Sequence, residues 1–263
     1  MSAPTASTSL AIVLPAYNEA ERIEPALDEL FAYLGRSAGA LGSIQVLVVD
    51  DGSEDGTADL VRARPEAQGE RQGPHLDVLS VPHGGKGAAV RAGMLAADAD
   101  LVVFADADMA TPPDQLPLLI AALAEADVAL GSRIQPDGFD MRASQPAFRR
   151  ALGRVFHGLA SIWVVGPVQD TQCGFKGFRR PAAHDLFGRQ QVTSIVFDVE
   201  LVYLARRRGY RLAVVPIQWD DRRGSRMRPG LALALRVAWD LFRIPLLHRG
   251  VRRAVPRTEG ERG

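Results

Sequence analysis

Hydrophobic and polar positions in the first half of the chain follow two alternating patterns. Short, nearly continuous apolar runs are typical of strands buried on both faces, and longer segments with apolar residues three or four positions apart are typical of amphipathic helices. The predicted strands are residues 10–14, 44–49, 76–81, 101–105 and 128–130, and the predicted helices are residues 21–34, 57–64, 86–97 and 114–124. Strands and helices that alternate at this spacing build βαβ units, so the pattern predicts an α/β fold with a mostly parallel, Rossmann-like sheet flanked by helices.

The second half of the chain is less regular. The pattern predicts helices at residues 147–165, 198–208 and 229–247, and strands at residues 173–178 and 211–218. Pro245 removes a backbone donor from the last helix and predicts a kink there. We therefore expect one domain over residues 10–228, a disordered tail at residues 1–9, and a helical extension over residues 229–263.

Composition is ordinary for a globular protein, with 47% hydrophobic and 24% charged residues in a chain of 263. A single cysteine, Cys173, excludes an internal disulfide framework and favours an intracellular location. Cys173 itself is expected to be a buried small apolar side chain rather than a nucleophile. No apolar run approaches the roughly 18 residues of a membrane-spanning helix, and the N-terminus lacks the basic and apolar regions of a signal peptide.

Charge is unevenly distributed although the formal net charge is zero. Residues 221–263 contain 11 arginines against 4 acidic residues, a net charge of +7, so the remainder carries a matching negative charge. A basic end on an acidic body indicates a polyanionic partner, either nucleic acid or anionic lipid. A solvated basic terminus is the alternative.

The apolar run at residues 101–105 is followed by two carboxylates, Asp106 and Asp108, with one residue between them. Open α/β sheets bind ligands beyond the carboxyl ends of their strands. Because two neighbouring carboxylates repel each other unless a cation neutralises them, this pair indicates a divalent metal site. The alternative is a solvated turn at the end of a strand, where Asp is a common residue.

Two other predicted strands also end in polar segments. The first leads into Pro15-Ala16-Tyr17-Asn18-Glu19, and the second leads into Asp50-Asp51-Gly52-Ser53. A carboxylate at such a place can accept hydrogen bonds from a base or from ribose hydroxyls, and Tyr17 can lie against a base. Gly52 and Gly56 allow the second loop to turn with positive φ. Each segment alone also fits plain turn chemistry, but their joint position at neighbouring strand ends favours a binding site.

The segment His83-Gly84-Gly85-Lys86-Gly87 precedes a predicted helix. Exposed backbone N–H groups and a lysine at the start of a helix favour phosphate. The segment is not a Walker A loop, because Ala88 stands where Ser or Thr is required, and it is not the Gly-x-Gly-x-x-Gly motif, because Val90 occupies the last glycine position. A phosphate-binding role is therefore predicted without an ATPase or a dehydrogenase.

These segments, followed by Gly131-Ser132-Arg133, occur in an order that resembles the inverting glycosyltransferases of family 2, which have the GT-A fold. The segments Asp170-Thr171-Gln172-Cys173-Gly174-Phe175-Lys176, Phe197-Asp198-Val199-Glu200 and Gly224-Ser225-Arg226 are similar to those of its dolichyl-phosphate β-glucosyltransferase branch. The resemblance covers about residues 10–228. It implies transfer of a hexose, most simply glucose from UDP-glucose, to a polyprenyl or dolichyl phosphate.

The resemblance also implies roles for individual residues. The nucleotide-sugar donor would be bound by Pro15, Tyr17, Glu19, Asp51, Lys86, Asp106 and Ala107. Asp106 and Asp108 would hold Mg²⁺ or Mn²⁺, which stabilises the leaving diphosphate as a Lewis acid. Arg133, Arg149 and Arg226 would face the acceptor phosphate. The catalytic group would be Asp170, Asp108 and Arg133.

Asp170 occupies the position where the family keeps a candidate general base. A phosphate acceptor is already mostly ionised near neutral pH, so it needs positioning more than deprotonation. The alternative is that Asp170 orients Lys176 or Arg179. Ala110 stands where mannosyl relatives often carry a third metal ligand, which leaves that ligand unassigned and favours the glucosyl branch.

The last predicted helix has Leu231, Leu235, Ala238 and Phe242 on one face and Arg236, Asp240 and Arg243 on another. A basic amphipathic helix with Trp239 suits an anionic bilayer, which predicts a cytoplasmic protein bound peripherally to a membrane. Packing of this helix on the domain is the alternative. Nucleic acid is disfavoured because the basic region has few interleaved aromatic residues. GDP-mannose as donor, a soluble acceptor, and a nucleotide-sugar-binding module without turnover remain as alternative functions.

Overall fold

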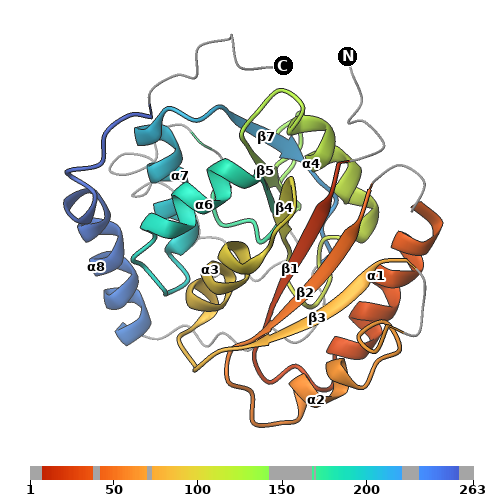
Figure 1. Cartoon of the computed structure of the whole chain (residues 1–263). Coiled ribbons are helices and arrows are strands. Elements are labelled where there is room, and N and C mark those ends of the chain that lie inside the picture. Colours follow the sequence, from red (N-terminus) through yellow and green to blue (C-terminus); the bar gives the residue numbers. More distant parts are fainter. Residues whose placement is uncertain are drawn as a thin grey trace.

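A computed structural model of the chain describes residues 8–37, 42–69, 73–141, 168, 170–220 and 231–254. In this part of the chain, one seven-stranded sheet has the order β3-β2-β1-β4-β6-β5-β7 (Figure 1). The strands are β1 (Leu10–Ala16), β2 (Ile44–Asp50), β3 (His75–Ser80), β4 (Leu101–Phe104), β5 (Val128–Ser132), β6 (Lys176–Arg179) and β7 (Leu212–Pro216). Strand β6 is antiparallel to its neighbours β4 and β5, and the other pairs are parallel. The predicted α/β fold with a mostly parallel sheet is confirmed.

Helices cover both faces of this sheet. They are α1 (Ile23–Ser37), α2 (Thr57–Arg62), α3 (Lys86–Ala96), α4 (Leu116–Ala122), α6 (Arg180–Arg189), α7 (Phe197–Arg208) and α8 (Leu231–Leu247), and a 3₁₀ helix, η1 (Pro113–Gln115), leads into α4. Helices α3, α6 and α7 pack on one face, and α1, α2 and α4 pack on the other. Helix α8 contacts α7 and lies at the edge of the molecule (Figure 1). None of the described helices is long and apolar enough to cross a bilayer.

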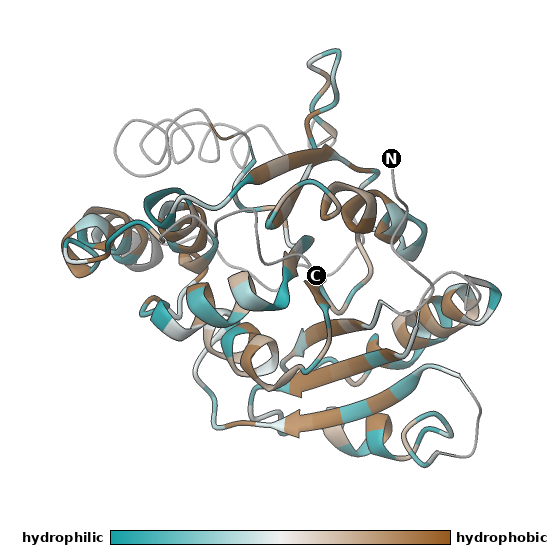
Figure 2. Ribbon diagram, turned by 45° about the horizontal axis from the view of Figure 1, so that its top comes forward, coloured by the Kyte–Doolittle hydropathy of each residue, from teal (hydrophilic) through white to brown (hydrophobic). Residues whose placement is uncertain are grey.

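The central strands are apolar at nearly every position because both of their faces are covered. In β1, Leu10, Ile12 and Leu14 contribute to the core beneath α1 and α4. Ala11 and Val13 contribute to the core beneath α3 and α7. Figure 2 shows the central strands coloured mainly as hydrophobic. The continuous apolar runs in the sequence are thus the consequence of a sheet between two layers of helices.

Most predicted elements are present, with ends displaced by up to three residues. The predicted strand at 173–178 begins later, at Lys176, and α6 was not predicted. The predicted helix at 147–165 lies outside the described residues. Of the predicted tail, Thr8 and Ser9 are described, and Ser9 is fixed by reciprocal hydrogen bonds with Asp100, one of them 2.8 Å between the side chains.

The carboxyl ends of β1, β2 and β4 lie side by side at one edge of the sheet, which we call the carboxyl edge. Ala16 at the end of β1 pairs with Asp50 at the end of β2, and Val13 of β1 pairs with Phe104 at the end of β4. Because β6 runs in the opposite direction, it begins at this edge, where Lys176 pairs with Phe104. The segment before β6 therefore reaches the same edge as the loops after β1, β2 and β4, where open α/β sheets bind ligands.

Candidate active site

Asp106 and Asp108 follow β4 at the carboxyl edge, with the buried Ala107 between them. The carboxylate of Asp106 contacts the Nζ of Lys86, and Asp108 accepts a hydrogen bond of 3.1 Å from the backbone N–H of Ala110. Burial raises the pKa of Asp108, and the like charge of Asp106 raises it further. A half-buried carboxylate with a second carboxylate beside it makes a place where an added cation is favoured.

Lys86 is the first residue of α3 and supplies positive charge at this place. Gly85, directly before it, has a φ of 89°, which lets the glycine-rich loop turn into the helix. Burial disfavours the charge on Lys86, but the surrounding carboxylates, Asp106 first among them, outweigh burial and raise the pKa of Lys86. A charged lysine and the N–H groups at the start of this 11-residue helix suit a phosphate group.

The donor atoms at this edge fit a hard divalent cation. Asp106 and Asp108 offer carboxylate oxygens, the ligand type that Mg²⁺ and Mn²⁺ prefer. Among the described residues, no three His, Cys, Asp or Glu side chains converge on one point, so phosphate oxygens and water would complete the coordination. The ammonium group of Lys86 forms an ion pair with Asp106, so this carboxylate has a cationic partner in the structure.

Asp51 follows β2 and fixes the glycine-rich loop. Its buried carboxylate accepts hydrogen bonds from the backbone N–H groups of Gly84 (2.8 Å) and Gly85 (3.0 Å) and lies 2.9 Å from the Nδ1 of His83. The ring of His83 stacks on the ring of Tyr17, with centroids 4.3 Å apart and an angle of 26° between the planes. Both side chains are exposed, so the carboxyl edge carries a flat aromatic surface next to the glycine-rich loop.

The loop after β1 carries an ion pair. Glu19 accepts two hydrogen bonds of 2.7 Å from the Nε and Nη2 of Arg22, and Pro15 is half-buried at the end of β1. The charge of Arg22 opposes the upward shift of the Asp108 pKa, which places Arg22 near the carboxylate pair. Arg22 was not predicted as a site residue, because the folded loop alone brings it to Glu19 and near Asp108.

Asp170 and Arg133 form a single unit. The buried Asp170 carboxylate accepts hydrogen bonds from the backbone N–H (2.8 Å), the Nε (2.8 Å) and the Nη2 (2.6 Å) of Arg133. The guanidinium carbon of Arg133 also lies 5.5 Å from the ring centroid of Trp219. Burial disfavours the charge on Arg133, but the hydrogen bond and the charge of Asp170 raise its pKa, so it remains protonated.

This pairing contradicts the alternative role considered for Asp170, in which it orients Lys176 or Arg179. Asp170 orients Arg133 and not Lys176 or Arg179, because Arg179 donates to the backbone carbonyls of Ala126 and Ala124, and Lys176 has a partner of its own.

Lys176 and Asp198 form a buried ion pair beneath the site. The Lys176 Nζ lies 2.6 Å from the Asp198 carboxylate, contacts the carbonyl of Cys173, and lies 5.3 Å from the ring centroid of Phe104. Both side chains are almost completely buried. Burial raises the pKa of Asp198, and the charges of Lys176 and Lys86 oppose that shift. The pair ties the start of β6 to the start of α7 directly below the carboxyl edge.

The loops at the carboxyl edge are strained. Asn18, Met109 and Asp170 have φ values of 54°, 49° and 46°, and they are the non-glycine residues with positive φ in the described part of the chain. Each belongs to a loop that carries a candidate site residue. Backbone strain of this kind concentrates at functional sites, where the surrounding structure holds it in place.

A sequence model of glycosyl transferase family 2 matches residues 11–187. The chain belongs to this family. It is 37% identical over 246 residues to the dolichyl-phosphate β-glucosyltransferase ALG5C of Trichomonas vaginalis, covering 90% of this chain and 71% of the relative. It is 37% identical over 247 residues to the Drosophila melanogaster dolichyl-phosphate β-glucosyltransferase (90% and 74%), and 32% identical over 230 residues to the human one (84% and 70%). The resemblance predicted from the motifs is confirmed.

Solved structures of other glycosyltransferases share the fold. The mannosyltransferase PcManGT of Pyrobaculum calidifontis, solved with GDP-Man and Mn²⁺, superimposes with a TM-score of 0.59 at 21% identity, covering 96% of this chain and 67% of that one. Mannosyl-3-phosphoglycerate synthase of Rubrobacter xylanophilus gives a TM-score of 0.52 at 21% identity, covering 96% and 78%. This glycosyltransferase therefore has the GT-A fold.

The structure brings together most of the residues predicted for the site of this glycosyltransferase, and Arg149 and Arg226 lie outside the described residues. Burial raises the pKa of the Cys173 thiol to about 11, and the charge of Asp170 adds to the shift, so Cys173 is the buried thiol that the sequence predicted and not a nucleophile. Trp219 was missed as a partner of Arg133, because nothing in the local sequence connects the two.

Gly174 had no predicted role beyond its motif. A methyl group at this position would lie 2.5 Å from the carboxyl carbon of Asp106, a distance that real contacts do not reach. The segment before β6 thus passes directly against the side chain of Asp106. Only glycine leaves room for Asp106 to stay beside Lys86.

We expect Gly174→Ala to lower transfer by ~10–100-fold, because the displaced carboxylate would lie in the wrong place for a metal ion and a diphosphate. Weaker Mn²⁺ binding, measured by calorimetry, should accompany the loss while the circular dichroism spectrum stays unchanged. Gly188→Ala is the matched control, since no atom lies within 4 Å of its added methyl. In α6 that change should stabilise the protein slightly. Equal activity of the two variants would contradict the positioning role of Gly174.

Proposed function

We propose that this protein transfers glucose from UDP-glucose to a polyprenyl phosphate, such as dolichyl phosphate, with inversion at the anomeric carbon. The observation that carries the proposal is the convergence of Asp106, Asp108 and Lys86 on one point of the carboxyl edge, within reach of the segment that holds Arg133. The printed names of the relatives, which are dolichyl-phosphate β-glucosyltransferases, support the choice of sugar and acceptor.

The donor would lie across the ends of β1, β2 and β4. The stacked rings of Tyr17 and His83 offer a face for the base. Pro15 and Glu19, in the same segment as Tyr17, would border the bound nucleoside. Asp51 holds the glycine-rich loop in place, so it shapes this subsite as well as lining it. Lys86 and the start of α3 would receive the diphosphate.

Asp106 and Asp108 would hold Mg²⁺ or Mn²⁺ beside the diphosphate. The metal, when bound, stabilises the negative charge that develops on the leaving UDP. Lys86 adds a second positive charge at the same place, and its raised pKa keeps it charged throughout. The solved mannosyltransferase that contains GDP-Man and Mn²⁺ has the same fold, which supports a divalent cation here.

Arg133 would bind the acceptor phosphate, and we assign to Asp170 the positioning of Arg133. The Asp170 carboxylate accepts hydrogen bonds from the Nε and Nη2 of Arg133, whereas the Nη1 of Arg133 has no hydrogen-bond partner among the described residues. That nitrogen can donate to a phosphate oxygen, which is a strong, charge-assisted interaction. Arg149 and Arg226 are proposed as further contacts. The phosphate oxygen, already ionised, attacks the anomeric carbon from the face opposite to UDP.

The acceptor is a lipid, so we propose that the protein associates peripherally with the membrane that contains it.

A transfer assay with radiolabelled donors tests the proposed function. UDP-glucose, but not GDP-mannose, should label an added polyprenyl phosphate, and chelation of divalent cations should stop the reaction. Transfer from GDP-mannose alone, or binding of UDP-glucose without any turnover in the presence of Mn²⁺ and lipid, would refute it.

A further inference from the structure

Helix α8 is fixed to the domain by its polar residues. The Asp240 carboxylate lies 2.6 Å from the Oγ of Ser194, and the His248 Nε2 lies 2.6 Å from the Glu200 carboxylate. Asp240 of α8 and His248, the residue directly after the helix, are buried, together with Leu241 and Ile244 of α8. The face of α8 that carries these residues is therefore the face that packs on α7 and on the loop before it.

The opposite face of α8 presents apolar side chains to solvent. Leu235, Trp239, Phe242 and Leu246 are 64%, 60%, 49% and 56% exposed, respectively. Their spacing of four, three and four residues places them in one line along the helix. The rings of Trp239 and Phe242 stack with centroids 6.2 Å apart. We call these four residues the α8 stripe. Leu235 and Phe242 belong to the apolar face predicted from the sequence. Asp240 shares a face with Arg243, as predicted, but it is buried against the domain.

The exposed charges near the α8 stripe are positive. In the described residues 231–254, Arg236, Arg249, Arg252 and Arg253 are exposed. Asp240 is the acidic residue of this segment, and it is buried and paired with Arg243 at 2.9 Å. An apolar line bordered by arginines matches an anionic bilayer surface, in which the apolar side chains enter the acyl region and the arginines meet the phosphates.

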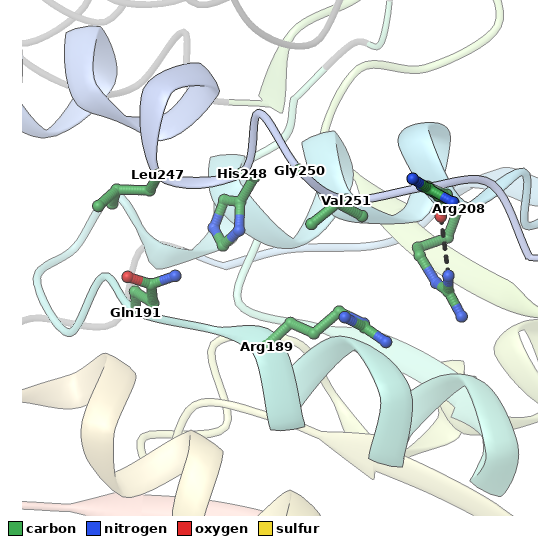
Figure 3. Close-up of a pocket in the computed structure, with 8 residues that line it drawn as sticks. Arg189, Gln191, Arg208, Leu247, His248, Gly250 and Val251 are labelled. Carbon is green, nitrogen blue, oxygen red and sulfur yellow. Dashed lines mark hydrogen bonds between the residues drawn. The ribbon is translucent and has the colours of Figure 1, made fainter.

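A basic pocket opens at the end of this stripe. It has a volume of about 390 Å³ and lies between the end of α6, α7 and the segment after α8 (Figure 3). Arg189, Arg208 and Arg252 line it, and Leu247, which is partly exposed, connects it to the α8 stripe. Asp185 pairs with Arg189 (2.8 Å) and Arg208 (2.6 Å), so two of these three guanidinium groups share one carboxylate. The excess positive charge suits the phosphate of a lipid headgroup.

We propose that the α8 stripe inserts into the surface of an anionic phospholipid bilayer and that the pocket of Arg189, Arg208 and Arg252 receives a headgroup phosphate. This inference rests on the proposed function, because it states how the protein reaches a lipid acceptor. Vesicle binding can nevertheless be measured without any glucose transfer, so the two can fail separately. In this proposal, the apolar side chains of the α8 stripe contact the acyl chains, and the exposed arginines contact the lipid phosphates.

Flotation of the full chain with vesicles of phosphatidylcholine and phosphatidylglycerol tests the proposal. Binding should require the anionic lipid, and the double variant Trp239→Ser and Phe242→Ser should lower the partition coefficient by at least about tenfold. Arg252→Gln should lower it by about fivefold, and inorganic phosphate at millimolar concentration should not compete. Leu118→Ser is the matched control, because Leu118 is an exposed apolar residue of α4, and it should bind vesicles normally.

A short-chain isoprenyl phosphate that is monomeric in water separates this proposal from the proposed function. The stripe variants should transfer glucose to this soluble acceptor at the normal rate and lose transfer only to acceptor embedded in vesicles. Unchanged vesicle binding by the Trp239 and Phe242 double variant would overturn the proposal. So would light scattering that shows a dimer dissociated by the same substitutions, since the stripe would then be an interface between two copies.

Discussion

Asp108→Ala should reduce glucose transfer by ~10³-fold or more, because it removes one of the two carboxylates that would hold the metal on the leaving diphosphate. The fold should survive the change. Burial and the charge of Asp106 raise the pKa of Asp108, so its carboxylate form is less favourable in the folded protein than in the unfolded chain. Loss of the carboxylate should therefore leave the melting temperature unchanged or slightly higher, as measured by calorimetry.

A second carboxylate provides the control for this experiment. Asp59 lies on α2, pairs with Arg62 at 3.1 Å, and is almost fully exposed. Asp59→Ala should keep full activity and the same affinity for Mn²⁺. Titration of Mn²⁺ in the presence of UDP should show weak or no binding for Asp108→Ala. Normal turnover by that variant would remove the metal assignment and with it the role given to Asp106.

Lys176→Ala should have the largest effect on stability, lowering the free energy of unfolding by about 3–5 kcal/mol. The substitution leaves the carboxylate of Asp198 without its partner at a place where both side chains are almost completely buried. Urea unfolding monitored by circular dichroism measures the loss. The deficit should be smaller at about pH 5 than at about pH 7.5, because the pKa of Asp198 is already raised by burial and the unpaired carboxyl can take up a proton.

The double variant Lys176→Met and Asp198→Leu distinguishes an unpaired charge from lost packing. Replacement of both partners removes the buried charge, so most of the stability should return. A double variant as unstable as Lys176→Ala would show that the ion pair matters through its shape rather than its charge. Loss of transfer in the stable double variant would indicate that Asp198, which also influences the pKa of Lys86, supports the site electrostatically.

The local pattern of apolar residues was sufficient to predict the strands of the parallel half of the sheet. Strands β1, β2 and β4 are near-continuous apolar runs, since helices cover both of their faces, and their polar ends mark the carboxyl edge. The motif residues Tyr17, Asp51, Lys86 and Asp106 could be found for the same reason: each directly follows a strand or begins a helix, so its position along the chain predicts its position at the edge.

Contacts between segments far apart in the sequence could not be predicted from local pattern. The sequence pattern predicted a strand at residues 173–178, whereas β6 begins at Lys176. Its antiparallel insertion between β4 and β5, which no local pattern predicts, carries Gly174 against Asp106. The pairing of Asp170 with Arg133 joins residues 37 positions apart, and the sequence alone suggested other partners. The face that α8 turns to solvent likewise depends on which of its sides finds polar partners on α7.

The sequence by itself determined most of the elements, the family and the identity of the chemical groups, because hydrophobic periodicity and short motifs act within one strand or helix and its adjoining loop. Tertiary structure alone decided which charged groups neutralise one another, which glycine must remain small, and which side of the last helix stays in contact with water. Those outcomes depend on contacts between segments distant along the chain. Burial there determines how strongly charged groups interact, and steric contact determines which side chains fit.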